Sequence, residues 1–354
     1  MLRSKRQLLT RCRTHDHKDA EIPGNKQEKS PVVANILVRE NYVQEEGTDM
    51  RLITRSDFDG LVCAMLFKKL GMVDEMKFVH PKDVQDGLIE VNANDILANV
   101  PYVAGCGYWF DHHSSELTRN GQNIQFQGET RVAPSAARVV YDYYGGREKF
   151  GAELDDIMAG VDKADAAQFS KENILNPQGW DLLSFIMDAR TGLGRYRDYR
   201  ISNYQLMEEL VVHCMTKPVD EIMQLPDVRE RVKRYFELDE QYRAMLAAHT
   251  RVDGNVIVSD LRNVDPIFPG NRFMVYALYP EQNISIWIVD GKNKQNCVFA
   301  CGHSIVNRGS NTDVGSLMLK YGGGGHAAAG TCQVEYNSAD EVLEQLVSTM
   351  KQDG

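Results

Sequence analysis

The sequence predicts an α/β protein, in which a domain with a parallel sheet is joined by a helical linker to a smaller mixed α/β domain. Three observations predict this arrangement. Short apolar strand segments alternate with helical segments in the first part of the chain. Helical periodicity then dominates residues 204–250, and strand-rich segments follow. The chain has 354 residues, which is enough to build two domains with buried cores.

The composition divides the chain into four parts. Residues 1–33 are expected to be a disordered basic tail, because residues 1–30 hold eight Lys or Arg against four Asp or Glu and few large apolar residues. Its histidines at 15 and 17 are most simply surface residues. The first domain is expected at residues 34–203, the linker at 204–250 and the second domain at 251–354.

The first domain is predicted to open with a strand at residues 51–54, a short SDFDG loop and a helix at 61–70. Further strands are predicted at 78–80, 87–91, 96–103 and 107–110. Further helices are predicted at 133–144, 153–165 and 181–189. The alternation indicates an open sheet wrapped by helices.

The second domain is predicted from β-rich segments at residues 256–259, 273–279, 284–289, 297–301 and 330–335. Two helices are expected in the same part, at 315–321 and 339–350. The glycine-rich run GGGGHAAAG lies between a helix and a strand.

Charge and composition exclude several classes of protein. The net charge of −10 argues against binding to long nucleic-acid duplexes, while small phosphorylated substrates remain compatible because a metal ion can reverse the local sign. No apolar run approaches the roughly 18 residues of a membrane-spanning helix. The seven cysteines form no CxxC pair, which predicts reduced thiols and a cytoplasmic protein.

A first pair of carboxylates follows the first predicted strand. Asp57 and Asp59 flank Phe58 and precede Gly60, at the kind of strand end where α/β sheets place their sites. Two carboxylates in such a loop can turn toward one cation, and without a cation they repel. The alternative is that Asp57 simply caps the following helix.

A second cluster, Asp111-His112-His113, follows the apolar segment YWF. A carboxylate and an imidazole together suit Mn²⁺, Zn²⁺ or Fe²⁺. Adjacent histidines cannot easily both bind one ion, so one is expected to be a ligand and the other to face substrate. The alternative is a surface loop with chance histidines.

These motifs together resemble one family. SDFDG, then DHH, then GGGGHAAAG near the C-terminus match the DHH phosphoesterase superfamily over roughly residues 34–350. The chain looks like the two-domain branch of nanoRNA and cyclic-dinucleotide phosphodiesterases, with exopolyphosphatase-like proteins as relatives. The resemblance implies a metal-dependent phosphohydrolase in which a bridging hydroxide attacks phosphorus in line at a two-metal site.

The resemblance also implies a set of site residues. The metal ligands would be Asp57, Asp59, Asp95, His112 and Asp165, with Asp162 as the alternative to Asp165. Asp111 and His113 would be the catalytic residues. Two Mn²⁺ ions are expected, with Mg²⁺ or Co²⁺ as alternatives.

The chain departs from the family pattern in one respect. Many members carry a ligand His just before the first aspartate pair, and here residues 53–55 are Ile, Thr and Arg. His80 is a candidate replacement for this ligand. The alternative is that His80 is a buried structural histidine.

On the substrate side, the resemblance assigns the glycine run, with its neighbours, to a clamp for the substrate terminus. The residues expected to bind substrate are Gly323, Gly324, Gly325, His326, Arg308 and Ser304. Clustered glycines let a backbone approach an anion closely, and Arg suits bidentate phosphate contacts. Alone, such a run would more often be a flexible loop. The Arg-rich stretch at 190–200 is either a basic wall or a solvated face.

The expected substrates are short oligonucleotides, linear or cyclic dinucleotides, or polyphosphate. The leading interpretation is a phosphodiesterase. The alternatives are an exopolyphosphatase-like enzyme and a non-catalytic nucleotide-binding module with a degenerate metal site. No membrane or long duplex is expected as a partner, and a homodimer is among the arrangements to be tested.

Overall fold

The computed structural model describes residues 50–113 and 124–354, so the predicted tail at 1–33 lies outside the described residues. The first part of this region forms a five-stranded sheet in the order β2-β1-β3-β4-β5, and all of its pairings are parallel. The strands are β1 (Met50–Arg55), β2 (Val73–Val79), β3 (Asp95–Ala98), β4 (Tyr108–Asp111) and β5 (Gln127–Thr130).

Alternate residues of these strands enter two different cores. Leu52 and Phe110 face a cluster built with helices, while Ile53 and Trp109, their neighbours in sequence, face a second cluster. All four side chains are fully buried. Because side chains alternate across a strand, a sheet covered on both faces needs apolar residues at consecutive positions. This explains the short apolar runs that predicted the strands.

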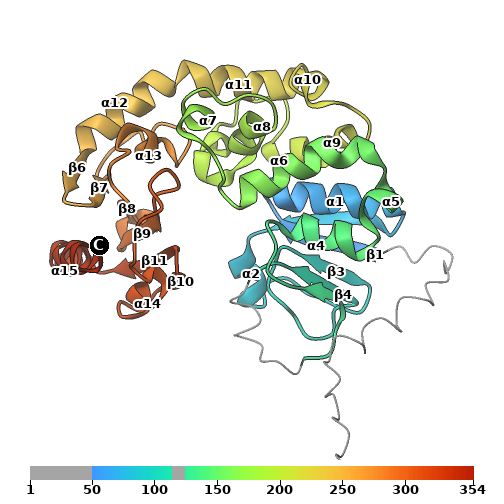
Figure 1. Ribbon diagram of the computed structural model, residues 1–354, viewed down its shortest axis with the longest axis horizontal. Helices are drawn as coiled ribbons and strands as arrows, with labels where there is room; N and C mark the ends of the chain where they lie inside the picture. The colour runs from blue at the N-terminus through green and yellow to red at the C-terminus, as the bar shows by residue number, and fades with distance from the viewer. Residues whose placement is uncertain (1–49, 114–123) are drawn as a thin grey trace, which may run out of the picture. The chain divides into compact units, whose positions relative to one another are not determined.

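Helices cover the face of this sheet that carries Leu52 (Figure 1). They are α1 (Phe58–Leu70), α4 (Ala136–Tyr143), α6 (Asp155–Asp165), α8 (Gly179–Met187) and α9 (Asn203–Cys214). The opposite face is covered by α2 (Pro81–Gln85) and by loop residues such as Tyr102 and Phe126. The short helices α5 (Gly146–Phe150) and α7 (Lys171–Leu175) complete this part of the chain.

Three helices follow α9 before the second sheet begins. They are α10 (Val219–Ile222), α11 (Pro226–Glu237) and α12 (Asp239–His249). Pro226 stands in the first turn of α11, where a missing backbone N–H costs nothing. The buried Arg231 of α11 stacks on the Tyr199 ring at 3.9 Å and donates to Asn203. These contacts anchor the helical segment to the end of the first domain.

The second sheet has six strands in the order β10-β11-β9-β8-β7-β6. They are β6 (Thr250–Asp253), β7 (Val256–Asp260), β8 (Ile284–Asp290), β9 (Cys297–His303), β10 (Gly324–His326) and β11 (Ala329–Val334). Only the β7–β8 pairing is parallel, so the sheet is mixed. Helices α14 (Val314–Leu319) and α15 (Ala339–Asp353) cover one face.

The other face of the second sheet contributes to a cluster that includes residues of the first domain. Phe169 and Phe185 pack with Phe273, with ring centroids 4.8 Å apart for the first two and 5.7 Å apart for Phe169 and Phe273. This contact brings the chain around residue 272 next to the end of α6.

The predicted fold class is confirmed, a parallel sheet followed by helices and a mixed sheet. The predicted domain boundaries stay predictions. Three strand predictions differ from the structure. Residues 273–279 contain helix α13 (Met274–Leu278), residues 87–91 form no strand, and the strand expected at 96–103 is confined to Asp95–Ala98. Strands β5, β6 and β10 were not predicted. A short apolar run such as FMVYALY fits a buried helix as well as a strand.

Within the described ranges, no helix is long and apolar enough to cross a membrane. The six cysteines in those ranges are all free thiols, and five of them are buried.

Candidate active site

Three neighbouring strands of the parallel sheet end at one edge, and polar residues lie at their ends. Asp57 follows β1, Asn99 follows β3, and the Asp111–His113 run begins at the last residue of β4. The carboxyl ends of parallel strands meet at the same edge, which is where α/β folds place ligands. Asp165, the last residue of α6, joins them from the helical layer.

Asp57 occupies the N-cap of α1, and its Oδ1 accepts a hydrogen bond from Gly60 N at 3.0 Å. The same oxygen accepts from Asn99 Nδ2 at 3.1 Å, and Oδ2 lies 2.9 Å from Arg55 Nε. Asp57 is therefore both a helix cap and part of the site. Gly60 is needed because a Cβ there would lie 1.9 Å from Arg55 O, so β1 and α1 could not approach.

Asp59, in the first turn of α1, is 2% exposed and is fixed by the helix that faces it. Its Oδ2 accepts from Ala136 N at 2.9 Å and its Oδ1 from Ala137 N at 2.8 Å. These amides lie at the start of α4, where helix N–H groups have no partner within the helix. The carboxylate is thus held rigidly, with its remaining lone pairs available to a cation.

His112 faces Asp59 and Asp165. Its Nε2 lies 3.0 Å from Asp165 Oδ2 and 3.9 Å from Asp59 Oδ2. Its Nδ1 is 3.1 Å from the carbonyl of Ala133, which can only accept, so Nδ1 carries the proton. Fixing one ring nitrogen against a carbonyl is how proteins orient a histidine that binds a metal through the other nitrogen.

His113 points to a different partner. Its Nδ1 is 2.8 Å from Oδ1 of Asp111, which is 1% exposed. The ring of His113 stacks on that of His326, with centroids 5.6 Å apart and planes inclined by 23°. The two histidines of the DHH run therefore have separate surroundings, and the second motif meets the glycine-rich motif that follows in the second sheet.

The residues present fit a divalent cation. Asp59, His112 and Asp165 each offer a ligand atom within 4.8 Å of the others, and so do Asp111, His112 and His113. Two carboxylates and an imidazole are suitable donors for Mn²⁺ and similar ions. Nearby, the buried Asn99 Oδ1 and Asp111 Oδ2 have no hydrogen-bond partner among the described residues. Such buried oxygens are unfavourable unless an ion or water satisfies them.

Without a bound cation, protons on the site residues offset the negative charge of this cluster. Burial, followed by the charge of Asp165, raises the pKa of Asp59 to about 7. Burial opposes the charged form of His112, but the hydrogen bond to Asp165 and the charge of Asp59 outweigh it and raise its pKa to about 10. Burial also opposes ionisation of Asp165, and the bond to His112 outweighs it and lowers the pKa of Asp165. A bound cation would replace these protons.

The prediction that Asp95 binds metal was wrong. Asp95 is the first residue of β3, so it lies at the amino end of the strand, opposite the edge that carries Asp57. It is 1% exposed and accepts from Arg51 Nε at 2.8 Å, Arg51 Nη2 at 2.9 Å and Asn92 N at 2.7 Å. The residue that leaves β3 at the site is Asn99.

Two other open choices can now be described. Asp162, the alternative to Asp165, accepts from Ser135 Oγ at 2.8 Å and from Arg138 Nη2 at 2.6 Å, and so serves the start of α4. Asp165 is the residue grouped with His112. His80 is exposed rather than buried and caps α2 by accepting from Lys82 N at 3.2 Å. It belongs to neither ligand group in the described part of the chain.

The glycine run forms a tight hairpin rather than an open loop. Gly324 to His326 make β10, which pairs with β11. A Cβ at Gly323 would lie 2.0 Å from Thr331 O, and one at Gly325 would lie 2.2 Å from Ala329 O. Close packing of the two strands therefore explains these glycines, and the exposed end of the hairpin presents His326. Substrate binding by Gly323, Gly324 and Gly325 stays a prediction.

Ser304 and Arg308 have different positions. Ser304 is 1% exposed, and its Oγ accepts from Val306 N and Asn307 N at 3.2 and 3.0 Å. Ser304 thus stabilises the turn after β9, and its role in substrate binding stays a prediction. Arg308 is exposed and donates from Nη2 to Ala167 O at 2.8 Å, two residues beyond Asp165. Arg308 thus lies beside the group of possible metal ligands that contains Asp165.

Three arginines near the carboxylates were not among the predicted site residues. Arg55 contacts Asp57, while Arg190 and Arg272 contact Asp188 at 2.8 and 3.5 Å. Asp57, Asp59 and Asp165 share a small cavity, about 50 Å³, with Arg190 and Arg272. Burial, with the nearby charge of Arg190, lowers the pKa of Arg272 to about 10, so it remains cationic at neutral pH. Only two features of the sequence indicated these arginines, namely an Arg near the end of the first predicted strand and the Arg-rich stretch at 190–200.

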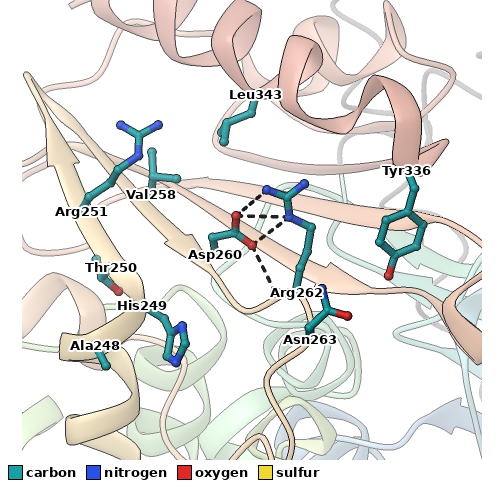
Figure 2. Close-up of a pocket in the computed structure, with 10 residues that line it drawn as sticks. All are labelled: Ala248, His249, Thr250, Arg251, Val258, Asp260, Arg262, Asn263, Tyr336 and Leu343. Atoms are coloured by element: carbon teal, nitrogen blue, oxygen red, sulfur yellow. Dashed lines mark hydrogen bonds and ion pairs between the residues drawn. The ribbon is translucent and has the colours of Figure 1, made fainter.

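A larger cavity, about 550 Å³, lies elsewhere, between α12, β7 and α15 (Figure 2). Arg262, which lines this cavity, is paired with Asp260 at 2.6 Å and with Asp340 at 2.8 Å. None of the residues in the two metal-type groups lines it. We therefore place the active site at the smaller cavity, where the carboxylates and imidazoles converge.

Comparison with known proteins identifies the family. No protein-family model matches the chain, and no curated protein matches it. Among solved structures, the pGpG-specific phosphodiesterase PggH from Vibrio cholerae is 48% identical, with a TM-score of 0.73, over 86% of this chain and 100% of that one. The DHH domain of a member of a ribosomal-protein family is 12% identical, with a TM-score of 0.54, over 86% and 87% of the two chains.

The second of these similarities supports the fold alone. The first is high in identity and spans the whole of the relative, and the DHH motif stands at the edge of the parallel sheet. The chain belongs to the DHH superfamily of phosphoesterases and is a metal-dependent phosphohydrolase.

Proposed function

We propose that this protein is a phosphodiesterase that hydrolyses short linear dinucleotides, with pGpG as its main substrate. The observation that carries the proposal is the stacking of His113 on His326, beside the Asp59–His112–Asp165 group. This stacking brings the possible metal ligands close to the glycine hairpin, which we expect to bind phosphate. The substrate itself comes from the 48% identical relative, whose name specifies pGpG.

The proposed reaction adds water across the bond that links the two nucleotides. Water attacks phosphorus, the P–O3′ bond breaks, and the O3′ atom takes a proton, so that pGpG gives two molecules of GMP. A divalent cation, when bound, supplies Lewis acidity and lowers the pKa of water at the site. We propose Asp59, His112 and Asp165 as its ligands, and Mn²⁺ as the ion, with Mg²⁺ or Co²⁺ as alternatives.

The side chains of the protein perform the remaining tasks. Asp111 accepts a hydrogen bond from His113 Nδ1 and so fixes the ring, which leaves Nε2 to face a phosphoryl oxygen. His326 is in position to contact the same phosphate from the second domain. Arg190 and Arg272 supply positive charge for the terminal phosphate of a dinucleotide. A net charge of −10 favours such a small substrate over a long polymer.

A substrate panel tests the proposal. Purified protein is incubated with Mn²⁺ and pGpG, pApA, a cyclic dinucleotide or polyphosphate, and products are separated by chromatography. We expect GMP from pGpG with a kcat/KM at least tenfold above that for any other substrate. Preferred release of phosphate from polyphosphate would support an exopolyphosphatase instead. Binding of pGpG without turnover would contradict the proposed activity.

We further propose a cytoplasmic location, which the free thiols of the described cysteines support. A homodimer stays a prediction, to be tested by light scattering on the purified protein.

A further inference from the structure

The hydrogen bonds of Asp57 set it apart from the other site carboxylates. Its Oδ1 accepts from Gly60 N and Asn99 Nδ2, and its Oδ2 lies 2.9 Å from Arg55 Nε. Asp57 also lies outside both groups of possible metal ligands in the described part of the chain. One side of the site therefore already contains a cation, the guanidinium of Arg55.

Asn99 supports the same conclusion independently. It is 2% exposed and follows β3 at the site edge, where a carboxylate would supply a negatively charged ligand beside Asp57. Its amide must face Asp57 with Nδ2, because Asp57 Oδ1 can only accept. Asn99 thus directs hydrogens toward Asp57, and its unpartnered Oδ1, which a water molecule can satisfy, adds no negative charge to attract a cation there.

The neighbouring residues of β1 do not supply another ligand. Ile53, the first of the three residues named above as lacking the family's histidine, is fully buried in the core on the opposite face of the sheet. His80 caps α2 on the surface. Among the described residues, the side of the site around Asp57 therefore has one carboxylate, one amide and one guanidinium.

The balance of charges at the site also argues against a second divalent cation. Asp57, Asp59 and Asp165 carry three negative charges when ionised, and Asp111 is paired with His113. One divalent ion and Arg55 neutralise those three charges. A second divalent ion would add two positive charges beside Arg190 and Arg272, and the further carboxylate that lines this cavity, Asp188, is already paired with those two arginines.

We propose that this enzyme binds a single divalent cation, at Asp59, His112 and Asp165, and that Arg55, held by Asp57, takes the place of a second one. This rests on the proposed phosphodiesterase function and replaces the two-ion arrangement that the resemblance implied. Arg55 uses Nε for Asp57, so its Nη groups can donate to a phosphoryl oxygen of the substrate.

The number of bound ions tests the proposal without any measurement of turnover. Metal-free full-length protein is titrated with Mn²⁺, bound metal is counted by equilibrium dialysis, and the electron paramagnetic resonance spectrum is recorded. We expect one Mn²⁺ per chain and the six-line signal of an isolated ion. Two ions per chain, or the signal of a spin-coupled pair, would overturn the proposal. Because no substrate is present, a failed substrate prediction cannot produce either result.

Variants then test the two residues that we hold responsible. The double variant Arg55→His with Asn99→Asp supplies an imidazole and a carboxylate, and we expect it to bind a second Mn²⁺ with a spin-coupled signal. Asn99→Asp is compatible with the backbone, because Asp tolerates the φ of 56° found at Asn99 almost as well as Asn does. Arg55→Lys keeps the fixed charge and should still bind one ion.

A folded double variant, checked by circular dichroism, that binds only one ion would contradict the assignment to Arg55 and Asn99. If the double variant does not fold, the stoichiometry of the wild-type protein still decides the main point.

Discussion

The imidazole of His113 stacks on that of His326, with ring centroids 5.6 Å apart. His113 follows a strand of the parallel sheet, and His326 ends the first strand of the glycine hairpin in the second sheet. Each ring thus limits the positions that the other can take. The contact connects the metal-type site to the hairpin that we expect to hold substrate.

The stacked histidines should act as a unit in catalysis. His113→Ala and His326→Ala are each expected to lower kcat/KM by about 100-fold, in the range of a lost proton donor. The double variant should lose far less than the product of both effects, because the stacked rings constrain each other. Steady-state kinetics with pGpG measures this. His80→Ala, on the surface, serves as the control, and full additivity would contradict the coupling.

Asp165 and Asp162 provide a matched pair on one helix. Asp165→Asn removes a proposed ligand and should weaken Mn²⁺ binding by at least about 100-fold, since even changes behind the ligands cost 10–100-fold. Asp162→Asn removes a partner of Ser135 and Arg138 instead, so it should lower the melting temperature and leave Mn²⁺ affinity within threefold. Calorimetric titration distinguishes the two. The reverse order of effects would restore Asp162 as the ligand.

Asp95 should matter for stability and not for metal. Asp95→Ala leaves the half-buried Arg51 guanidinium without its carboxylate and should lower the free energy of unfolding by about 3 kcal/mol. Mn²⁺ affinity should stay unchanged, because Asp95 is at the opposite end of the sheet. Asp86→Ala breaks an exposed pair with Lys82 and should cost less than about 0.5 kcal/mol. Urea unfolding measures both, and a loss of Mn²⁺ binding in Asp95→Ala would contradict the assignment.

Metal affinity should rise with pH. The pKa of Asp59 is raised to about 7 and that of His112 to about 10, so both groups hold protons that a cation must displace. Fewer protons compete as pH increases. Displacement of the His112 proton throughout gives about 100-fold tighter Mn²⁺ binding at pH 8 than at pH 6, and the Asp59 proton, bound mainly below pH 7, adds a further factor of about 10. The increase in melting temperature on adding Mn²⁺ should grow accordingly. An affinity independent of pH would argue against these ligands.

The arginines of the small cavity should affect substrate binding more than chemistry. Arg272→Ala is expected to raise the KM for pGpG at least about tenfold, the loss of one charge-assisted hydrogen bond, with a smaller change in kcat. Arg272→Lys should restore part of the affinity. Arg262→Ala, in the larger cavity of Figure 2, is the control and should leave KM unchanged. A fall in kcat alone would place Arg272 in the chemical step.

Short motifs named several residues that the structure brings together. Asp57, Asp59, His112 and Asp165 were identified from short motifs, and the structure brings the last three within ligand distance of one another. The same reasoning failed at Asp95, because Asp95 would follow a strand only if residues 87–91 formed one, and they do not. Asp95 instead begins β3, and the predicted strand at 96–103 ran past Asn99, the residue that follows β3 at the site.

The residue pattern alone was enough to establish the α/β class, the order of the motifs and the kind of chemistry they support. Local hydrophobic periodicity and short polar motifs carry that information directly. Which polar residues meet was settled by long-range packing. The pairing of Asp95 with Arg51, the contact of Arg55 and Asn99 with Asp57, and the meeting of His113 with His326 depend on strand register and domain contacts. Those contacts form between segments far apart in the chain, and no local pattern encodes them.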